Sequence, residues 1–256
     1  MLCTRSTRLL LLKKMKIHST FPTLALAAIS VIGTASAATI YSDSLIGSNT
    51  ALNSSTVDSS AAFAGGTSGA AWTAATSINE TATGAALPTN TMAFLPITIT
   101  AGNIYTLQAT MTNNGAGWGA LGFSDSSTTD GAWHTTNTKY AWGLLRPTGD
   151  LNPNAFFGGA NTDNPPGWTS ADIGTQTMTI TLDTTNAAWS TYASINGVNS
   201  DTFTYTTNPT TITHVGFGVQ SATSEVSNFS LTAVPEPSVA LLGGLGVLAL
   251  LRRRRA

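Results

Sequence analysis

Hydrophobic and polar residues alternate with a period of two along most of the middle of this chain. In residues 104–112 (IYTLQATMT) and 177–183 (TMTITLD), apolar side chains occupy every second position, and threonine or glutamine occupies most positions between them. The same period appears in residues 96–100, 140–145, 214–220 and 228–233. One apolar side per segment predicts antiparallel strands, each with a buried face and a solvated face.

Turn-forming residues separate these segments, and helix signals between them are weak. The turns are NNGAG (113–117), NPN (152–154), DNPPG (163–167) and Asn196-Gly197. Strands that recur without intervening helices predict an all-β, two-sheet antiparallel jelly-roll sandwich. We expect one such domain over residues 38–233, with Trp142 and Leu144 buried on one face of their strand.

The order of strands resembles the concanavalin A-like, laminin-G-like jelly rolls. It runs from a first strand at 39–45 (TIYSDSL), through 105–111, 118–124 and 140–146, to a last one at 226–234 (VSNFSLTAV). The resemblance implies that the first and last strands pair. The structural alternative is an immunoglobulin-like sandwich, but about 100 residues per copy would require two copies, and the sequence shows no internal repeat.

The first 37 residues have the pattern of a signal peptide, and we expect them to form a signal helix. Lys13, Lys14 and Lys16 precede a short apolar run, 24–33. Ala35-Ser36-Ala37 then supplies the small residues that signal peptidase reads, so cleavage is expected before Ala38. A start at Met15 would shorten the leader to 23 residues. The alternative is a retained N-terminal anchor.

Residues 234–256 combine a proline pair, an apolar run and a basic end. Pro235-Glu236-Pro237 is followed by 13 apolar or small residues, 239–251, and then by the four arginines Arg252, Arg253, Arg254 and Arg255. As a helix, this run spans about 20 Å, against a hydrocarbon core of about 30 Å. It is a short hydrophobic helix that would cross a membrane only marginally, and the arginines would remain in the cytoplasm. The two prolines keep the preceding segment extended.

This arrangement resembles the PEP-CTERM sorting signal. The resemblance implies processing by exosortase, transient residence in the inner membrane, and export to the cell surface or the exopolysaccharide or biofilm matrix of a Gram-negative bacterium. Exosortase and signal peptidase are then the expected partners, and exopolysaccharide is a further candidate. A plain C-terminal anchor is the alternative, but it leaves the Pro-Glu-Pro unexplained.

The formal net charge of −1 for the whole chain hides a strongly acidic middle. Residues 38–233 hold two basic and eleven acidic residues, a net charge of −9, because nine of the eleven basic residues lie in the two ends. Such a surface repels nucleic acid phosphates, so no nucleic acid partner is expected. The only cysteine, Cys3, lies in the expected leader, and no disulfide is predicted for the mature protein.

Signatures of catalysis are missing from the middle of the chain, and we expect no enzyme activity. The strand motif Glu-x-Asp-x-x-Glu, usual in glucanases of this jelly roll, does not occur, nor does G-x-S-x-G. No zinc motif is present, and His214, at the start of a strand, is expected to be structural. Asp150, Asn152 and Asn154 space oxygen ligands as a calcium loop does but lack its glycine and glutamate. No cofactor is expected, with calcium as the weak exception.

Tryptophans are the remaining candidates for ligand-binding residues. Trp142 and Trp189 alternate within strands and are expected in the core, whereas Trp133 and Trp168 lie in loop-like sequence and are candidates for an exposed sugar-stacking platform. Three hypotheses follow: a non-enzymatic, exported surface or matrix protein; a lectin-like carbohydrate-binding module; and, least favoured, a glucanase-type glycoside hydrolase.

Overall fold

A computed structural model describes residues 36–113, 118–133, 141–145, 156–158, 174–220 and 224–236. The chain divides into two compact units, 1–33 and 34–256, and every described residue belongs to the second. Within these ranges every element is a strand, and Trp133 is the one residue assigned to a helix. The helices expected at the two chain ends fall outside the described residues. None of the residues described belongs to a helix long and apolar enough to cross a membrane.

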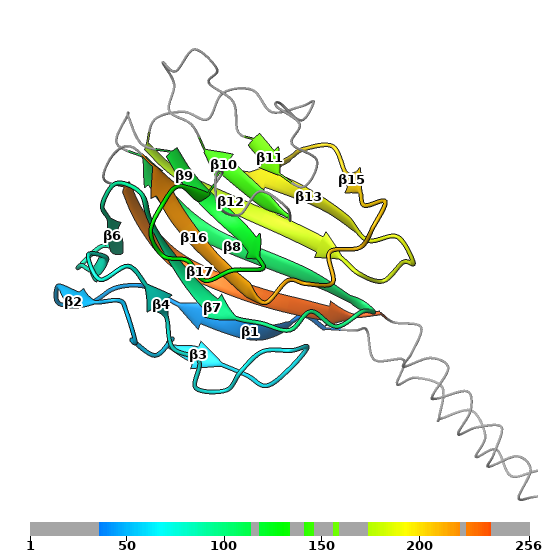
Figure 1. Cartoon of the computed structure of the whole chain (residues 1–256), viewed down its shortest axis with the longest axis horizontal. Coiled ribbons are helices and arrows are strands. Elements are labelled where there is room, and N and C mark those ends of the chain that lie inside the picture. The colour runs from blue at the N-terminus through cyan, green and yellow to red at the C-terminus, as the bar shows by residue number, and fades with distance from the viewer. Residues whose placement is uncertain are drawn as a thin grey trace, which may run out of the picture. The chain divides into compact units, whose positions relative to one another are not determined.

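Seventeen strands lie in the described residues (Figure 1). They are β1 (Ala38–Asp43), β2 (Thr50–Ala51), β3 (Ser59–Ser60), β4 (Thr73–Ala74), β5 (Asn79–Glu80), β6 (Ala85–Leu87), β7 (Thr91–Pro96), β8 (Asn103–Asn113), β9 (Trp118–Ser124), β10 (Trp142–Leu145), β11 (Phe156–Gly158), β12 (Gly174–Asp183), β13 (Ser190–Ile195), β14 (Val198–Asn199), β15 (Phe203–Thr204), β16 (His214–Gln220) and β17 (Ser224–Pro235).

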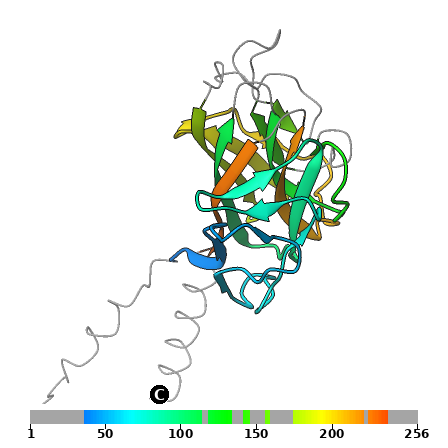
Figure 2. The same ribbon diagram turned by 90° about the vertical axis from the view of Figure 1, so that its left-hand side faces the viewer.

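The strands form two antiparallel sheets that pack face to face as a jelly-roll sandwich (Figures 1 and 2). The larger sheet has the order β14-β13-β12-β8-β17-β6-β5-β2, with β1 paired to β17 and β3, and β15 paired to β13. The smaller sheet has the order β11-β10-β9-β16-β7-β4. The all-β jelly roll expected from the alternating pattern is therefore confirmed.

The alternation predicts which side chains are buried. In β8, Tyr105, Leu107, Ala109 and Met111 are buried, and the residues between them are more exposed. β12 follows the same rule except at the buried Thr181, whereas residues 215–219 of β16 are all buried. The expected turn at Asn196-Gly197 joins β13 to β14, and both residues have the positive φ angles (49° and 84°) of a type I′ hairpin.

The first and last strands pair, as the jelly-roll resemblance implies. Ala38 at the start of β1 lies opposite Ala233 of β17, and Asp43 lies opposite Phe229. On its other side, β17 pairs with β8 along most of its length. The last strand is thus internal to the larger sheet, and the chain ends of the domain emerge at adjacent positions.

One expected strand is wrong. Residues 96–100 (PITIT) were expected to form a strand, but β7 covers Thr91–Pro96 and ends where they begin. Beyond Pro96 the backbone leaves the ladder, because Ile97 N–H donates to Thr213 O (2.8 Å) and Thr98 N–H to Gly65 O (2.9 Å). These hydrogen bonds to two separate loops replace strand pairing, so the alternating residues here do not belong to a sheet.

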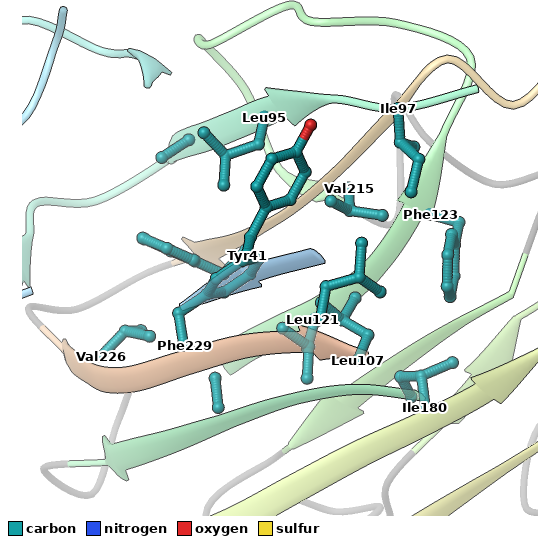
Figure 3. Packing of buried hydrophobic residues seen from close by; sticks show 14 of the residues in the cluster. Tyr41, Leu95, Ile97, Leu107, Leu121, Phe123, Ile180, Val215, Val226 and Phe229 are labelled. Carbon is teal, nitrogen blue, oxygen red and sulfur yellow. The ribbon is translucent and has the colours of Figure 1, made fainter. Parts of the chain in front are cut away.

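The main core lies between the two sheets and receives side chains from both (Figure 3). Leu107 and Ile180 come from the larger sheet, and Leu121 and Val215 from the smaller. Tyr41 is fully buried among them, and its hydroxyl donates to Pro96 O (2.6 Å) and accepts from Thr67 N–H (2.7 Å). This hydroxyl ties β1 of one sheet to β7 of the other.

A buried carboxylate supports the edge of this core. Asp43 is 5% exposed and accepts hydrogen bonds from Trp72 Nε1 (2.7 Å) and Leu45 N–H (2.8 Å). The Trp72 ring packs against Phe217 and Phe229, at centroid distances of 5.1 and 4.9 Å. Burial raises the pKa of Asp43, and the hydrogen bonds from Trp72 and Leu45 oppose that rise.

Removing the indole donor should make stability more sensitive to pH. The pKa of Asp43 is higher in the folded state than in the unfolded state. Its titration therefore contributes stability that is fully present below the unfolded-state pKa and is lost as pH rises through the folded-state pKa. Trp72→Phe keeps an aromatic ring but leaves the carboxylate short of a donor. We expect it to lower the unfolding free energy by about 1–3 kcal/mol at pH 7, and by less at pH 4, in urea titrations. An equal loss at both pH values would contradict this role for Asp43.

Candidate functional site

A second apolar cluster lies on the outer face of the smaller sheet, separate from the main core. It consists of the buried residues Met92, Phe94, Ala120, Trp133, Trp142 and Leu144, with the partly buried Trp118 against them. We call this set the outer cluster. Alternate residues of β7, β9, β10 and β16 face it, and the residues between them face the main core.

Strand register explains how the outer cluster forms. Phe94, Gly216, Gly122 and Trp142 lie side by side across four strands, and the next row is Met92, Gly218, Ala120 and Leu144. The two central strands therefore carry only glycine or alanine in these rows. A side chain added at Gly122 would collide with the Cβ of Trp142. The small residues leave a strip of backbone flanked by large apolar side chains.

The prediction that Trp142 and Leu144 are buried is confirmed, but their side of the sheet differs from the main core. Their exposed fractions are 6% and 2%. The neighbouring Gly143 faces the main core instead, where an added Cβ would lie 2.9 Å from Ile180 Cδ1. Gly143 is small because β10 lies close to β12 there, and the large side chains occupy the outer face.

Trp133 does not form the exposed platform that its loop-like sequence suggested. It is 1% exposed, and its ring stacks on Phe94 with a centroid distance of 5.3 Å and an interplanar angle of 28°. A contribution of Trp133 to ligand binding stays a prediction. In that role it would act as part of a buried aromatic pair.

Three buried polar atoms on this face have no hydrogen-bond partner. They are Nε1 of Trp133, Nε1 of Trp142 and Oε1 of Gln220, which lies opposite Trp118 in the register. Leaving a buried donor or acceptor unpaired costs about 1–3 kcal/mol. Two donors and one acceptor beside aromatic faces are what a small polar molecule with apolar faces would satisfy.

His214 borders the outer cluster. Its ring lies edge-on to Phe94, with centroids 6.2 Å apart, and its Nδ1 lies 2.8 Å from Thr213 Oγ1. Burial lowers the pKa of His214. The expectation of a structural histidine agrees with these contacts, and the lowered pKa favours the neutral ring.

Acidic residues are absent from the strands of the smaller sheet. None of the residues that form β4, β7, β9, β10, β11 and β16 is aspartate or glutamate. Within the described ranges, no group of three or more histidine, cysteine, aspartate or glutamate side chains is placed to hold a metal ion. The calcium candidates Asp150, Asn152 and Asn154 lie outside the described residues, as does Trp168.

The predicted processing sites adjoin the first and last strands. Ala38 begins β1, and Ala37 immediately precedes it. Pro235 is the last residue of β17 and lies opposite Asn103, and Glu236 N–H donates to Gly102 O (2.9 Å). Ala35, Pro237 and the arginines Arg252 to Arg255 lie outside the described residues.

The sequence interpretation did not identify Phe94, Trp118 or Gln220 as site residues. The sequence does contain a pattern around these residues, but its meaning depends on which strands pair. In WGALGF and GFGV, large residues alternate with glycine or alanine, and the glycines face outward only once strand pairing is known. The unpaired indole N–H groups have no sequence signal at all.

No protein-family model matches the chain, and no curated protein matches it significantly. Similar solved structures are concanavalin A-like jelly-roll domains. The carbohydrate recognition domain of Emp47p has a TM-score of 0.45 and 13% identity, covering 76% of this chain and 95% of that one. An endo-1,3-β-glucanase from Streptomyces sioyaensis has a TM-score of 0.45 and 12% identity, covering 79% and 98%. The carbohydrate-binding module CBM66 from Bacillus subtilis has a TM-score of 0.43 and 15% identity, covering 62% and 94%.

Two substitutions at Trp142 should separate packing from hydrogen bonding. Trp142→Ala should lower the unfolding free energy by about 3–5 kcal/mol, the usual range for a buried aromatic residue. Trp142→Phe keeps a ring and removes a donor that has no partner, so its cost should be under about 1.5 kcal/mol. Urea unfolding followed by fluorescence measures both. A small effect of Trp142→Ala would place this side chain in solvent.

Proposed function

We propose that this chain is a non-enzymatic protein that is exported through the inner membrane of a Gram-negative bacterium and sorted by exosortase to the cell surface or the exopolysaccharide matrix. The observation that carries the proposal is where the folded domain starts and stops. Its first strand begins at Ala38, directly after the expected signal peptidase site, and its last strand ends at Pro235, within the Pro-Glu-Pro triplet.

Trimming at both ends would leave this domain whole. Removal of residues 1–37 takes no residue from β1, and removal of the residues after Glu236 takes none from β17. Ala38 and Ala233 are paired, so the two cleavage sites lie at the same end of the larger sheet. This arrangement is expected of a domain delivered by two removable signals.

The absence of carboxylates from the smaller sheet supports a non-enzymatic role. Glycoside hydrolysis commonly needs two carboxyl groups flanking the bond to be cut. The strands of the smaller sheet offer neither, and the outer cluster is apolar and aromatic. A glucanase-type hydrolase is therefore the least favoured of the three hypotheses.

The sorting proposal is tested by following the C-terminus in the host. Changing Pro235, Glu236 and Pro237 together to alanine preserves the apolar run and the arginines, and should leave the precursor uncut in the inner membrane. Deletion of the exosortase should have the same effect on the native chain. Mass spectrometry of protein recovered outside the cell provides the readout. Secreted protein that still ends at Ala256 would refute the proposal.

The outer cluster favours a second candidate function, binding of a neutral carbohydrate. Sugar rings combine apolar faces with hydroxyl groups that both donate and accept hydrogen bonds. They therefore suit aromatic surfaces bearing unpaired indole N–H groups and an unpaired amide oxygen. Among the described residues, the strands of the smaller sheet carry no lysine or arginine to pair with an acidic sugar, and residues 38–233 carry a net charge of −9. Neutral glycans are the class that fits.

Binding would engage Trp133 and Trp142 together. Trp133 lies outside the strands, and its ring would have to separate from Phe94 to admit a sugar. Trp142 is fixed in β10, and its indole N–H would donate to a sugar hydroxyl. The cost of exposing the cluster is offset only where the ligand satisfies all three unpaired atoms.

Removing the indole donors should weaken binding without unfolding the domain. Trp133→Phe and Trp142→Phe should each lower affinity for a neutral polysaccharide by about tenfold, equivalent to one hydrogen bond of about 1.4 kcal/mol. Trp189→Phe, in the main core, is the matched control and should bind as the native protein does. Affinity electrophoresis on the host's own polysaccharide and on neutral glucans measures this. Unchanged binding by both variants would contradict the assignment of the outer cluster.

A further inference from the structure

The start of the sorting motif is part of the folded sheet. Val234 and Pro235 continue β17 and lie opposite Ile104 and Asn103 of β8. The next N–H, that of Glu236, donates to Gly102 O at 2.9 Å. Two of the three residues of the Pro-Glu-Pro triplet are thus held by the turn that precedes β8.

That turn is braced by hydrogen bonds from several directions. Gly102 N–H donates to Thr184 O (3.0 Å), and Thr184 N–H donates to Asn103 O (3.0 Å). The buried Thr184 hydroxyl also donates to Asn103 O (2.7 Å). The Tyr105 hydroxyl accepts from Thr100 N–H (2.9 Å) and lies 2.9 Å from Ala64 O. With these restraints, the turn is held in place and cannot follow the strand end if it is pulled away.

Among the described residues, the strand end is held from one side. β1 pairs with β17 no further than Ala38 opposite Ala233, so β8 is the one described strand beside Val234 and Pro235. Pro235 has no N–H to give to the ladder. The last residues of β17 are therefore the part of this strand whose local unfolding costs the least free energy.

We propose that the folded domain gates its own sorting cleavage: the β17 end must separate from Gly102 and Asn103 before the protease can take the Pro-Glu-Pro segment. This inference rests on the proposed exosortase sorting. Proteases bind extended segments through backbone hydrogen bonds, as an added strand does. The backbone that a protease would bind at Pro235 and Glu236 is already paired with Asn103 and Gly102. The cleavage rate then follows the equilibrium population of the open end.

A reversible cross-link across the strand end tests the gate. Ile104 and Val234 are direct partners in an antiparallel pair, where Cα atoms lie about 4.5–5.5 Å apart, within the range that a disulfide bridges. The double variant Ile104→Cys, Val234→Cys introduces the only cysteines after Cys3, leaving the Pro-Glu-Pro triplet intact. Formation of the cross-link, read by gel mobility without reductant, also reports that β17 has folded onto β8.

We expect the oxidised double variant to be cleaved at least about tenfold more slowly than the native precursor in a pulse-chase experiment, since the opening that governs native-state proteolysis is blocked. Dithiothreitol should restore the native rate, and each single-cysteine variant should be cleaved normally. Cleavage of the cross-linked form at the native rate would overturn the gate. Slow cleavage that persists after reduction would also overturn it, because the substitutions and not the cross-link would then be responsible.

A spacer tests the gate in the opposite direction. Gly-Ser-Gly-Ser inserted between Val234 and Pro235 moves the triplet off the turn and should speed cleavage. The same four residues inserted after the exposed Gly197, in the β13–β14 turn, should leave the rate unchanged. No acceleration by the first insertion would overturn the gate. Failure of the native precursor to be cleaved at all would instead refute the sorting proposal, so the two failures are distinguishable.

Discussion

Pairing of the last strand between β8 and β1 is the constraint on which the rest of this fold depends. β17 is internal to the larger sheet, so its neighbours have unpaired edges until residues near the end of the domain are in place. These contacts join residues separated by nearly the whole domain, which makes them costly in chain entropy and slow to form. Under the proposed sorting, export and folding would be linked at one element, because the strand that completes the sheet ends within the Pro-Glu-Pro triplet.

The local part of this structure could be predicted, and the non-local part could not. Alternation identified β8, β12 and β16 as strands, and it identified the buried faces of β8 and β12, since which side chains share a face of a strand is a property of neighbouring residues. It did not predict that both faces of β16 are buried. It did not tell which face of β10 meets the other sheet. Gly143 faces the main core because β12 approaches there, and that approach is not encoded within residues 140–145.

The candidate site shows the same limit. Trp133 and Trp142 could be recognised as candidate chemistry from their residue type, but the stacking of Trp133 on Phe94 joins β7 to a distant connection. The expected strand at 96–100 failed for a related reason. Polar and apolar residues do alternate there, but the N–H groups of Ile97 and Thr98 donate to two loops whose proximity the sequence alone does not predict.

The main core and the outer cluster differ in whether their buried polar atoms are hydrogen-bonded. In the main core, the Trp72 indole donates to Asp43, and the Tyr41 hydroxyl makes two hydrogen bonds across the sheets. The outer cluster and its border hold three of the five unpaired buried side-chain atoms found in the described residues. Buried polar groups are normally paired, and exceptions gather where a structure serves something other than its own stability.

The position of the two chain ends gives this difference a functional meaning. β1 and β17, the first and last strands, both belong to the larger sheet, whereas the outer cluster lies on the far side of the smaller sheet. A domain held by its C-terminal end would therefore keep the outer cluster away from its attachment. A neutral polymer carries no net charge, so charge attraction would contribute little to its binding there. Selectivity would rest on the aromatic faces and on the unpaired indole donors.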